Sequence, residues 1–98
     1  MSTSVQEETD PFAGVRELIS RIEKVIELIP KDFKNRDNFI GSLTKRMESV
    51  KYTAPAALGL RVAEIANILD YYLPEGTHPE LREQIGDIIC APLPNYSD

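Results

Sequence analysis

The sequence predicts an all-α fold, a compact bundle of about four antiparallel amphipathic helices. Apolar residues recur every three or four positions in four separate segments, which is the spacing of one helix face. Proline and glycine residues separate the segments, and no stretch alternates apolar and polar residues over a useful length. With 98 residues, 42% of them hydrophobic, the chain is long enough to bury one core and form one domain.

The first predicted helix begins at Asp10 and ends before Pro30. An aspartate followed by a proline is a helix-start signal, because the carboxylate accepts from free backbone N–H groups and proline fits the first turn. Apolar residues follow at helical spacing, at Val15, Leu18, Ile22, Val25 and Ile29. Residues 1–9 lack this periodicity and are predicted to form a flexible N-terminal tail.

Two central segments predict the second and third helices. Residues 32–50 carry an apolar side made of Phe33, Ile40, Leu43, Met47 and Val50, with Phe39 beside them. A break near residues 35–38 is the alternative to one continuous helix. The third helix is expected to bury Leu58, Val62, Ile65, Leu69 and Tyr72 and to end before Pro74.

The fourth predicted helix follows a capping box formed by Thr77 and Glu80. In that motif the threonine accepts from one free N–H group and the glutamate reaches back to another. Leu81, Ile85, Ile88 and Ile89 then follow at helical spacing. The bundle therefore covers residues 10–90, and residues 91–98, which include two prolines, are predicted to form an extended C-terminal tail.

The residues that carry most enzyme chemistry are scarce. His78 is the only histidine and falls in the predicted turn, and Cys90 falls at the end of the fourth helix, where a free cysteine behaves as a small hydrophobic residue. A metal site made only of Glu64 and Asp70 is a weak alternative, because metal sites normally bring more convergent ligands. We therefore expect no catalytic residues, no metal and no cofactor.

The net charge of −5 makes nucleic acid and anionic membranes less favoured partners. The polar, acidic N-terminal sequence shows no targeting signal, and the single cysteine cannot form an internal disulfide. No apolar run approaches the length of a membrane span. These features predict a protein of the reducing cytoplasm.

The charges are unevenly distributed along the chain. Residues 31–51 hold six Lys and Arg against three Asp and Glu, a net of +3, whereas residues 52–98 hold two against seven, a net of −5. One interpretation is that these halves attract each other across the bundle or stay solvated. The other is a docking face for an acidic partner, centred on Lys45 and Arg46.

The third predicted helix carries apolar residues on two sides. Leu60 and Tyr71 fall roughly opposite its core side, next to Glu64 and Asn67. Either neighbouring helices cover both sides, or these two residues form an exposed patch for a homodimer contact or a partner helix. Four small residues flank the core side, where another helix could approach closely: Ala56, Gly59, Ala63 and Ala66.

The predicted C-terminal tail offers a weaker candidate. Leu93 and Tyr96 could serve as a short linear ligand in extended chain, or the segment could fold back over the bundle. The sequence as a whole favours a non-enzymatic protein–protein interaction module, an adaptor, regulatory subunit or inhibitor that presents a helix face. A nucleic-acid-binding regulator that uses the basic second helix is the alternative.

Overall fold

The computed structural model describes residues 12–93, and its first helix is α2 (Ala13–Leu28). The predicted start at Asp10 and Pro11 lies outside these residues. The predicted end is confirmed, because the backbone of Ile29 is already extended (ψ 122°), as the steric demand of the following proline requires. Val15, Leu18, Ile22 and Val25 are all buried on one side of the helix, as their spacing predicts.

The second helix, α3 (Arg36–Lys51), begins four residues later than predicted. Phe33 and Asn35 instead belong to a turn, in which the Phe33 N–H bonds to the carbonyl of Pro30. Asn35 takes the left-handed conformation (φ 61°), which asparagine tolerates better than most residues. The alternative break at residues 35–38 was therefore closer to the structure than a continuous helix from Asp32.

A short 3-10 turn, η1 (Pro55–Ala57), leads into α4 (Leu58–Tyr72), and α5 (Pro79–Cys90) is the last helix. The predicted capping box is wrong. The residue before α5 is His78, in the left-handed region (φ 44°), and no side chain caps the helix. Since Pro79 occupies the first helical position, Thr77 stands one residue too early, and its hydroxyl donates to the Pro74 carbonyl at 2.7 Å.

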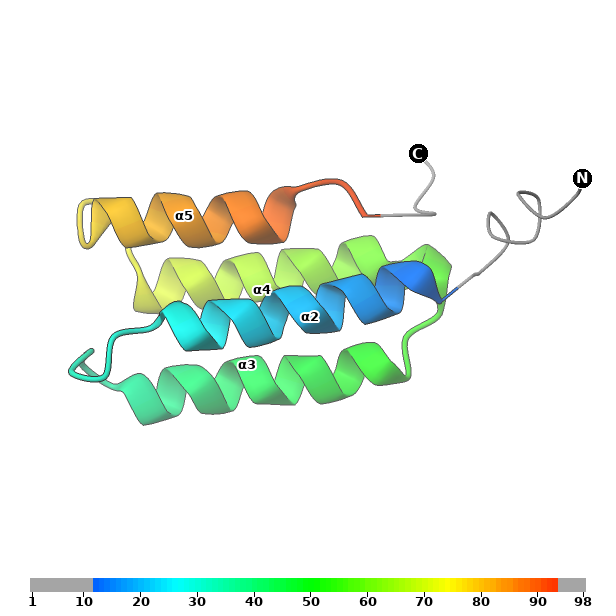
Figure 1. The fold of residues 1–98 in the computed structure, drawn as a ribbon, viewed down its shortest axis with the longest axis horizontal. Coiled ribbons are helices and arrows are strands. Elements are labelled where there is room, and N and C mark those ends of the chain that lie inside the picture. Colours follow the sequence, from blue (N-terminus) through cyan, green and yellow to red (C-terminus); the bar gives the residue numbers. More distant parts are fainter. Residues whose placement is uncertain (1–11, 94–98) are drawn as a thin grey trace, which may run out of the picture.

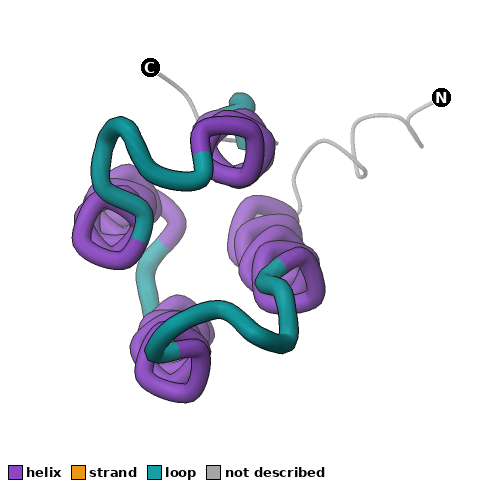
Figure 2. Tube along the Cα trace, turned by 90° about the vertical axis from the view of Figure 1, so that its left-hand side faces the viewer, coloured by secondary structure: helices purple, strands orange, loops and turns teal. Residues whose placement is uncertain are grey.

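The four helices form an up-down-up-down bundle, which confirms the predicted fold class. Successive helices run in opposite directions and are joined by short connections (Figure 1). Viewed along the bundle, they occupy the four corners of a square (Figure 2). α2 and α4 each pack against both α3 and α5, and the part of the chain that the structure describes contains no β-strand.

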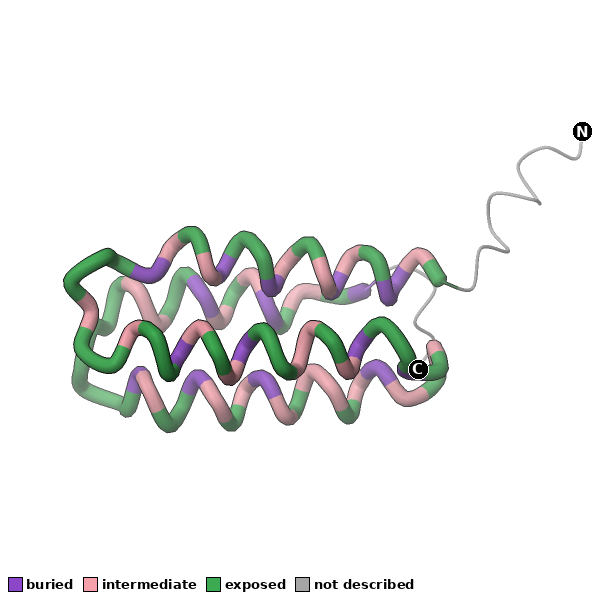
Figure 3. The backbone as a smooth tube through the Cα atoms, turned by 90° about the horizontal axis from the view of Figure 1, so that it is seen from below, coloured by how far each residue is buried: buried purple, intermediate pink, exposed green. Residues whose placement is uncertain are grey.

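One continuous core fills the space between the helices. Buried positions recur at regular intervals along each helix, with exposed positions between them (Figure 3). The largest side chains buried in the core are Phe39, Leu18, Ile22, Leu43, Leu58, Ile65, Leu73, Ile85 and Ile89. Because this burial removes one apolar stripe of each helix from water, it is the main force that holds the bundle together.

The first residues after α5 pack back onto the bundle. Leu93 is only 9% exposed and belongs to the core cluster. The Arg21 guanidinium donates to the carbonyl oxygens of Ala91 and Pro92 at 2.6 and 2.8 Å. This segment therefore follows the fold-back interpretation, and Leu93 is not available as a docking residue. Tyr96 lies outside the described residues.

Candidate interaction surface

The outer side of α4 exposes two large apolar side chains. Leu60 is 60% exposed and Tyr71 is 77% exposed, so the neighbouring helices do not cover this side. The interpretation in which α4 is central and buried all round is therefore wrong. It fails because α4 occupies a corner of the bundle, where only the sides toward α3, α5 and the core are covered (Figure 2).

The two residues belong to a longer exposed stripe, which we call the α4 outer stripe. At about 100° per residue the four members within α4 fall within about 80° of one another around the helix axis, and Ala56, in η1, precedes them. The α4 outer stripe consists of Ala56, Leu60, Ala63, Asn67 and Tyr71, all of which are exposed. Gly59 and Ala66, from the predicted small-residue flank, are partly buried instead.

The carboxylate of Glu64 lies beside this stripe and joins α4 to α3. It accepts from Arg46 of α3 at 3.0 Å and from Arg61 of α4 at 2.8 Å. Arg61 also donates to the hydroxyl of the buried Thr53 at 3.0 Å, and that hydroxyl donates to the carbonyl of Ser49 at 2.7 Å. These hydrogen bonds connect the C-terminal end of α3 to the α3–α4 connection and to the first turns of α4.

The two arginines determine the protonation of the glutamate. The hydrogen bond from Arg61, and then that from Arg46, holds the pKa of the Glu64 carboxyl below its ordinary value, although desolvation acts in the opposite direction. Glu64 is thus a carboxylate at neutral pH. The sequence contained one signal for this network. Arg61 and Glu64 are three residues apart on one helix, which is a spacing at which opposite charges form an ion pair.

Lys45 and Arg46, the predicted basic pair, have different roles. Arg46 is half-buried and is held by Glu64, as expected if the basic and acidic halves attract each other. The Lys45 side chain is exposed and has no ion-pair partner among residues 12–93. Lys45 therefore presents an unpaired positive charge next to the α4 outer stripe, and the two arginines that share Glu64 leave one more positive charge beside it.

A shallow groove separates α3 from α4 and is lined by the predicted basic pair, but by neither Leu60 nor Tyr71. One depression of about 400 Å³ is lined by Ser42, Lys45, Arg46, Glu64, Asn67 and Ile68. A second depression of about 350 Å³ shares Ser42 and Lys45 with the first and reaches Tyr72. The groove thus places Lys45 at the same level along the bundle as Glu64 and Asn67.

Contacts between aromatic rings hold the C-terminal end of α4, where Tyr71 lies. Tyr72 stacks on the buried Phe39 with ring centroids 4.7 Å apart and planes only 10° from parallel. Tyr71 meets Tyr72 edge-on at 4.9 Å. Phe39 is contacted in turn by Phe33, whose ring lies 4.9 Å from that of His78. The backbone of Tyr71 is therefore held firmly while its own ring remains exposed.

His78 and Cys90 do not combine into a reactive site. They flank opposite ends of α5, so about 18 Å of helix separates them. Cys90 is exposed, which corrects the expectation that it packs as a small hydrophobic residue. The proposed metal ligands Glu64 and Asp70 are occupied by arginines, Asp70 by Arg82 at 3.1 Å. No three His, Cys, Asp or Glu side chains within residues 12–93 are grouped to hold a metal ion.

The basic residues of α3 are not gathered on one side. Arg46 faces α4 and pairs with Glu64, whereas Lys51 pairs with Glu48 on its own helix. Arg36 is half-buried and Lys45 is exposed. Binding to a phosphate backbone needs several cations on one exposed face, and α3 does not present such a face.

No helix within the described residues is both long enough and apolar enough to cross a membrane. Comparison of the chain with models of known protein families, with curated proteins and with solved structures finds no match. The surface itself is therefore the basis for any functional conclusion.

Proposed function

We propose that this protein is a non-enzymatic protein-interaction module that binds a protein partner through the α4 outer stripe and the adjoining Lys45. The observation that carries the proposal is the exposure of Leu60 and Tyr71 on one side of a rigid helix. Their burial in the folded chain would stabilise it, so their position outside the core is better explained by an interface. Tyrosine is enriched at the core of protein interfaces and among the residues that dominate binding energy.

The surroundings of the stripe support a specific contact. Small or short side chains at Ala63 and Asn67 leave room for a partner helix between the two large residues. Lys45, at one edge, favours a carboxylate on the partner over a second cation. Such a module could act as an adaptor, a regulatory subunit or an inhibitor, because each of these activities needs only a preformed helix face.

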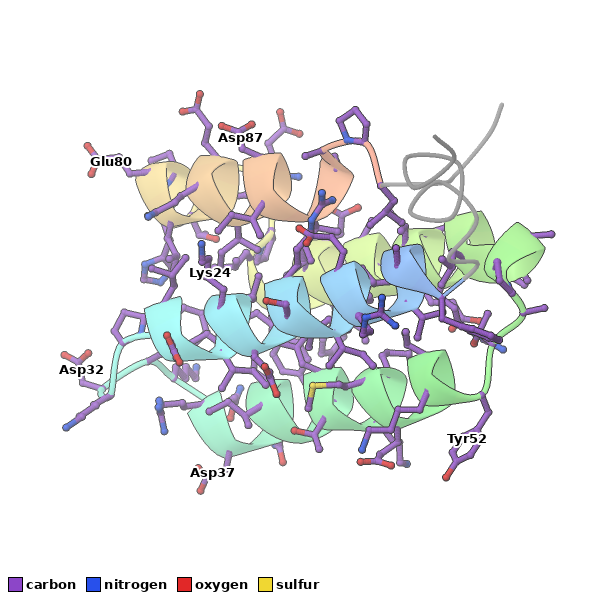
Figure 4. The ribbon with its side chains drawn as sticks, turned by 45° about the vertical axis from the view of Figure 1, so that its right-hand side comes forward. Lys24, Asp32, Asp37, Tyr52, Glu80 and Asp87 are labelled. Atoms are coloured by element: carbon purple, nitrogen blue, oxygen red, sulfur yellow. The ribbon has the colours of Figure 1, made fainter. Side chains whose placement is uncertain are left out.

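The proposal is tested by photo-crosslinking in lysate of the native cells. A photoreactive phenylalanine analogue replaces Leu60 or Tyr71 in two variants, and Tyr52 in a third. Tyr52 is the matched control, because it is 86% exposed and projects away from the bundle at the end of α3 (Figure 4). We expect protein adducts from positions 60 and 71 that the Tyr52 variant does not form.

Equal labelling from all three positions, or no protein adduct from positions 60 and 71, would contradict the proposal. A competition arm uses unlabelled protein: the wild type should suppress the adducts, whereas the Leu60→Glu variant should not. The same samples at low salt, with duplex and single-stranded probes, test nucleic-acid binding. Nucleic-acid capture that depends on Lys45 but not on Leu60 would favour that function instead.

A further inference from the structure

We propose that the partner of the α4 outer stripe is an amphipathic helix of another protein that carries carboxylates along one edge, the edge that faces α3. This inference rests on the proposed function and names the chemistry of the partner for the same surface. It follows from the shape of the stripe, from an excess of positive charge on its α3 side and from an excess of negative charge on its α5 side.

The shape of the surface favours a helix as the docking element. The two anchors, Leu60 and Tyr71, are eleven residues apart, or about 16 Å along α4, and only the small Ala63 and the short Asn67 lie between them in the stripe. A straight helix can lie along such a face and reach both anchors with apolar residues of its own. An extended segment binds instead by hydrogen bonding to the edge of a sheet, and residues 12–93 contain no strand.

The α3 side of the stripe has more positive than negative charge. Glu64 is a single carboxylate shared by two arginines, Arg46 at 3.0 Å and Arg61 at 2.8 Å. Lys45 is exposed in the same groove and has no ion-pair partner among residues 12–93. Three cations therefore lie beside one carboxylate, and a further carboxylate brought by a partner is attracted to this place.

The other carboxylates of α3 do not neutralise this excess. Glu48 is paired with a lysine of its own helix at 3.1 Å. Asp37 borders the second depression of the groove, but it is eight residues from Lys45, or about 12 Å along α3. Near Lys45 the groove also presents the Ser42 hydroxyl and the Asn67 amide, which can donate hydrogen bonds. The groove therefore offers both positive charge and hydrogen-bond donors to a carboxylate on the partner.

The α5 side of the stripe has the opposite charge. α5 carries three carboxylates against the single Arg82, a net of −2, whereas α3 has a net of +2. The carboxylates are those of Glu80, Glu83 and Asp87, and all three residues are exposed (Figure 4). Arg82 is already paired with Asp70 of α4 at 3.1 Å. A helix on the stripe lies between these two sides, so carboxylates are favoured along its α3 edge and disfavoured along its α5 edge.

A displayed library of helical peptides, selected against the full chain, tests this chemistry. Each peptide is about 16 residues long, which is enough to span both anchors, and has leucine or alanine along one face. Glutamate, glutamine and lysine are randomised along both edges of that face. We expect the selected peptides to carry glutamate along one edge only, and to bind Leu60→Glu at least about tenfold more weakly than wild type. Selected peptides with lysine or glutamine along both edges would overturn the proposal.

Charge exchange tests whether Lys45 meets the partner carboxylate. Lys45→Glu should raise the Kd of a selected peptide by about five- to tenfold in fluorescence anisotropy, and Lys45→Gln should raise it by a smaller factor. Replacing the glutamates along the acidic edge of the peptide by lysines should reverse the preference, so that this peptide binds Lys45→Glu more tightly than wild type. A peptide that binds all three proteins equally would overturn the proposal.

Lys24→Glu is the matched control for the change in net charge. Lys24 is also exposed, but it lies on α2, at the corner of the bundle opposite α4 (Figure 2). This variant should change the Kd by less than about twofold. Weakening as large as that of Lys45→Glu would mean that only the net charge matters, and would overturn the proposal. Circular dichroism verifies that each variant keeps the helical bundle.

The two proposals fail in different ways. Protein adducts from positions 60 and 71 in lysate, together with selected peptides that lack an acidic edge or with no selected peptide at all, overturn the acidic helix as partner and leave the interaction module intact. Absence of such adducts, together with absence of any peptide whose binding depends on Leu60, overturns both proposals.

Discussion

The two sides of α4 carry similar residues in opposite environments. Leu58 is 1% exposed and lies in the core, whereas Leu60, two positions later, is 60% exposed. Tyr72 stacks on Phe39, whereas the adjacent Tyr71 is 77% exposed. The inner residues hold the bundle together, and the outer ones leave apolar surface in water. The difference is the reason why the outer side of α4 is the candidate interaction surface.

The largest difference in folding stability should be between the alanine variants of Leu58 and Leu60. Leu58→Ala removes a fully buried side chain and should lower the free energy of unfolding by about 2–5 kcal/mol. Leu60→Ala should change it by less than about 0.5 kcal/mol, because no cavity is formed. Urea unfolding of both variants at the same protein concentration measures the two changes. Similar losses in the two variants would show that the outer side also contributes to folding.

The neighbouring tyrosines give a second matched pair. Tyr72→Ala removes the stacking on Phe39 and part of the core, and should lower the free energy of unfolding by about 1–3 kcal/mol. Tyr71→Ala should cost less than about 0.5 kcal/mol, because only the edge contact with Tyr72 is lost. Thermal and urea unfolding of both variants make the comparison. A greater loss for Tyr71→Ala would contradict the division between the two sides.

The Glu64 network should make a smaller contribution that depends on pH. Because the pKa of Glu64 is lower in the folded protein, its ionisation stabilises the fold fully above the unfolded pKa, and this stabilisation is lost as the pH falls through the folded pKa. Glu64→Gln should lower the Tm at pH 7, and its difference from wild type should shrink below about pH 4. Thermal melts from pH 7 to about pH 3 measure this. A difference that stays constant would exclude the ionic contribution.

The smallest effect concerns two glycines outside the core. Gly41→Ala in α3 should raise the free energy of unfolding by about 0.5–1 kcal/mol, because the added methyl group meets nothing within 4 Å and alanine favours helix. Gly76→Ala, at φ +92°, should instead destabilise the turn between α4 and α5. Urea unfolding of both variants checks the signs, and stabilisation by both would contradict the assigned turn conformation.

Helix periodicity predicted the fold well, because burial follows directly from which residues share a side. The stripe of α2 and the core side of α4 both lie where the spacing places them. The ends of helices were harder to predict. The start of α3 depends on Asn35 and the start of α5 on His78, directly before Pro79. Both residues adopt the left-handed conformation, which the apolar spacing does not predict.

The candidate site was predicted only in part. The sequence identified Leu60 and Tyr71 as sharing a side, but their exposure depends on the corner position of α4, which spacing alone does not determine. Likewise, the charge pattern predicted that Lys45 and Arg46 together form the centre of one docking face. Only the packing of α3 against α4 shows that Arg46 is bound by Glu64 while Lys45 remains exposed.

Hydroxyl-radical footprinting of Tyr71 and Tyr52 tests the central claim, that the outer side of α4 is an interaction surface. Both rings are exposed in the monomer and should react similarly in dilute purified protein. In native lysate, we predict that Tyr71 becomes protected while Tyr52 keeps its reactivity. A Tyr71 ring that stays as reactive in lysate as in dilute solution would contradict the claim.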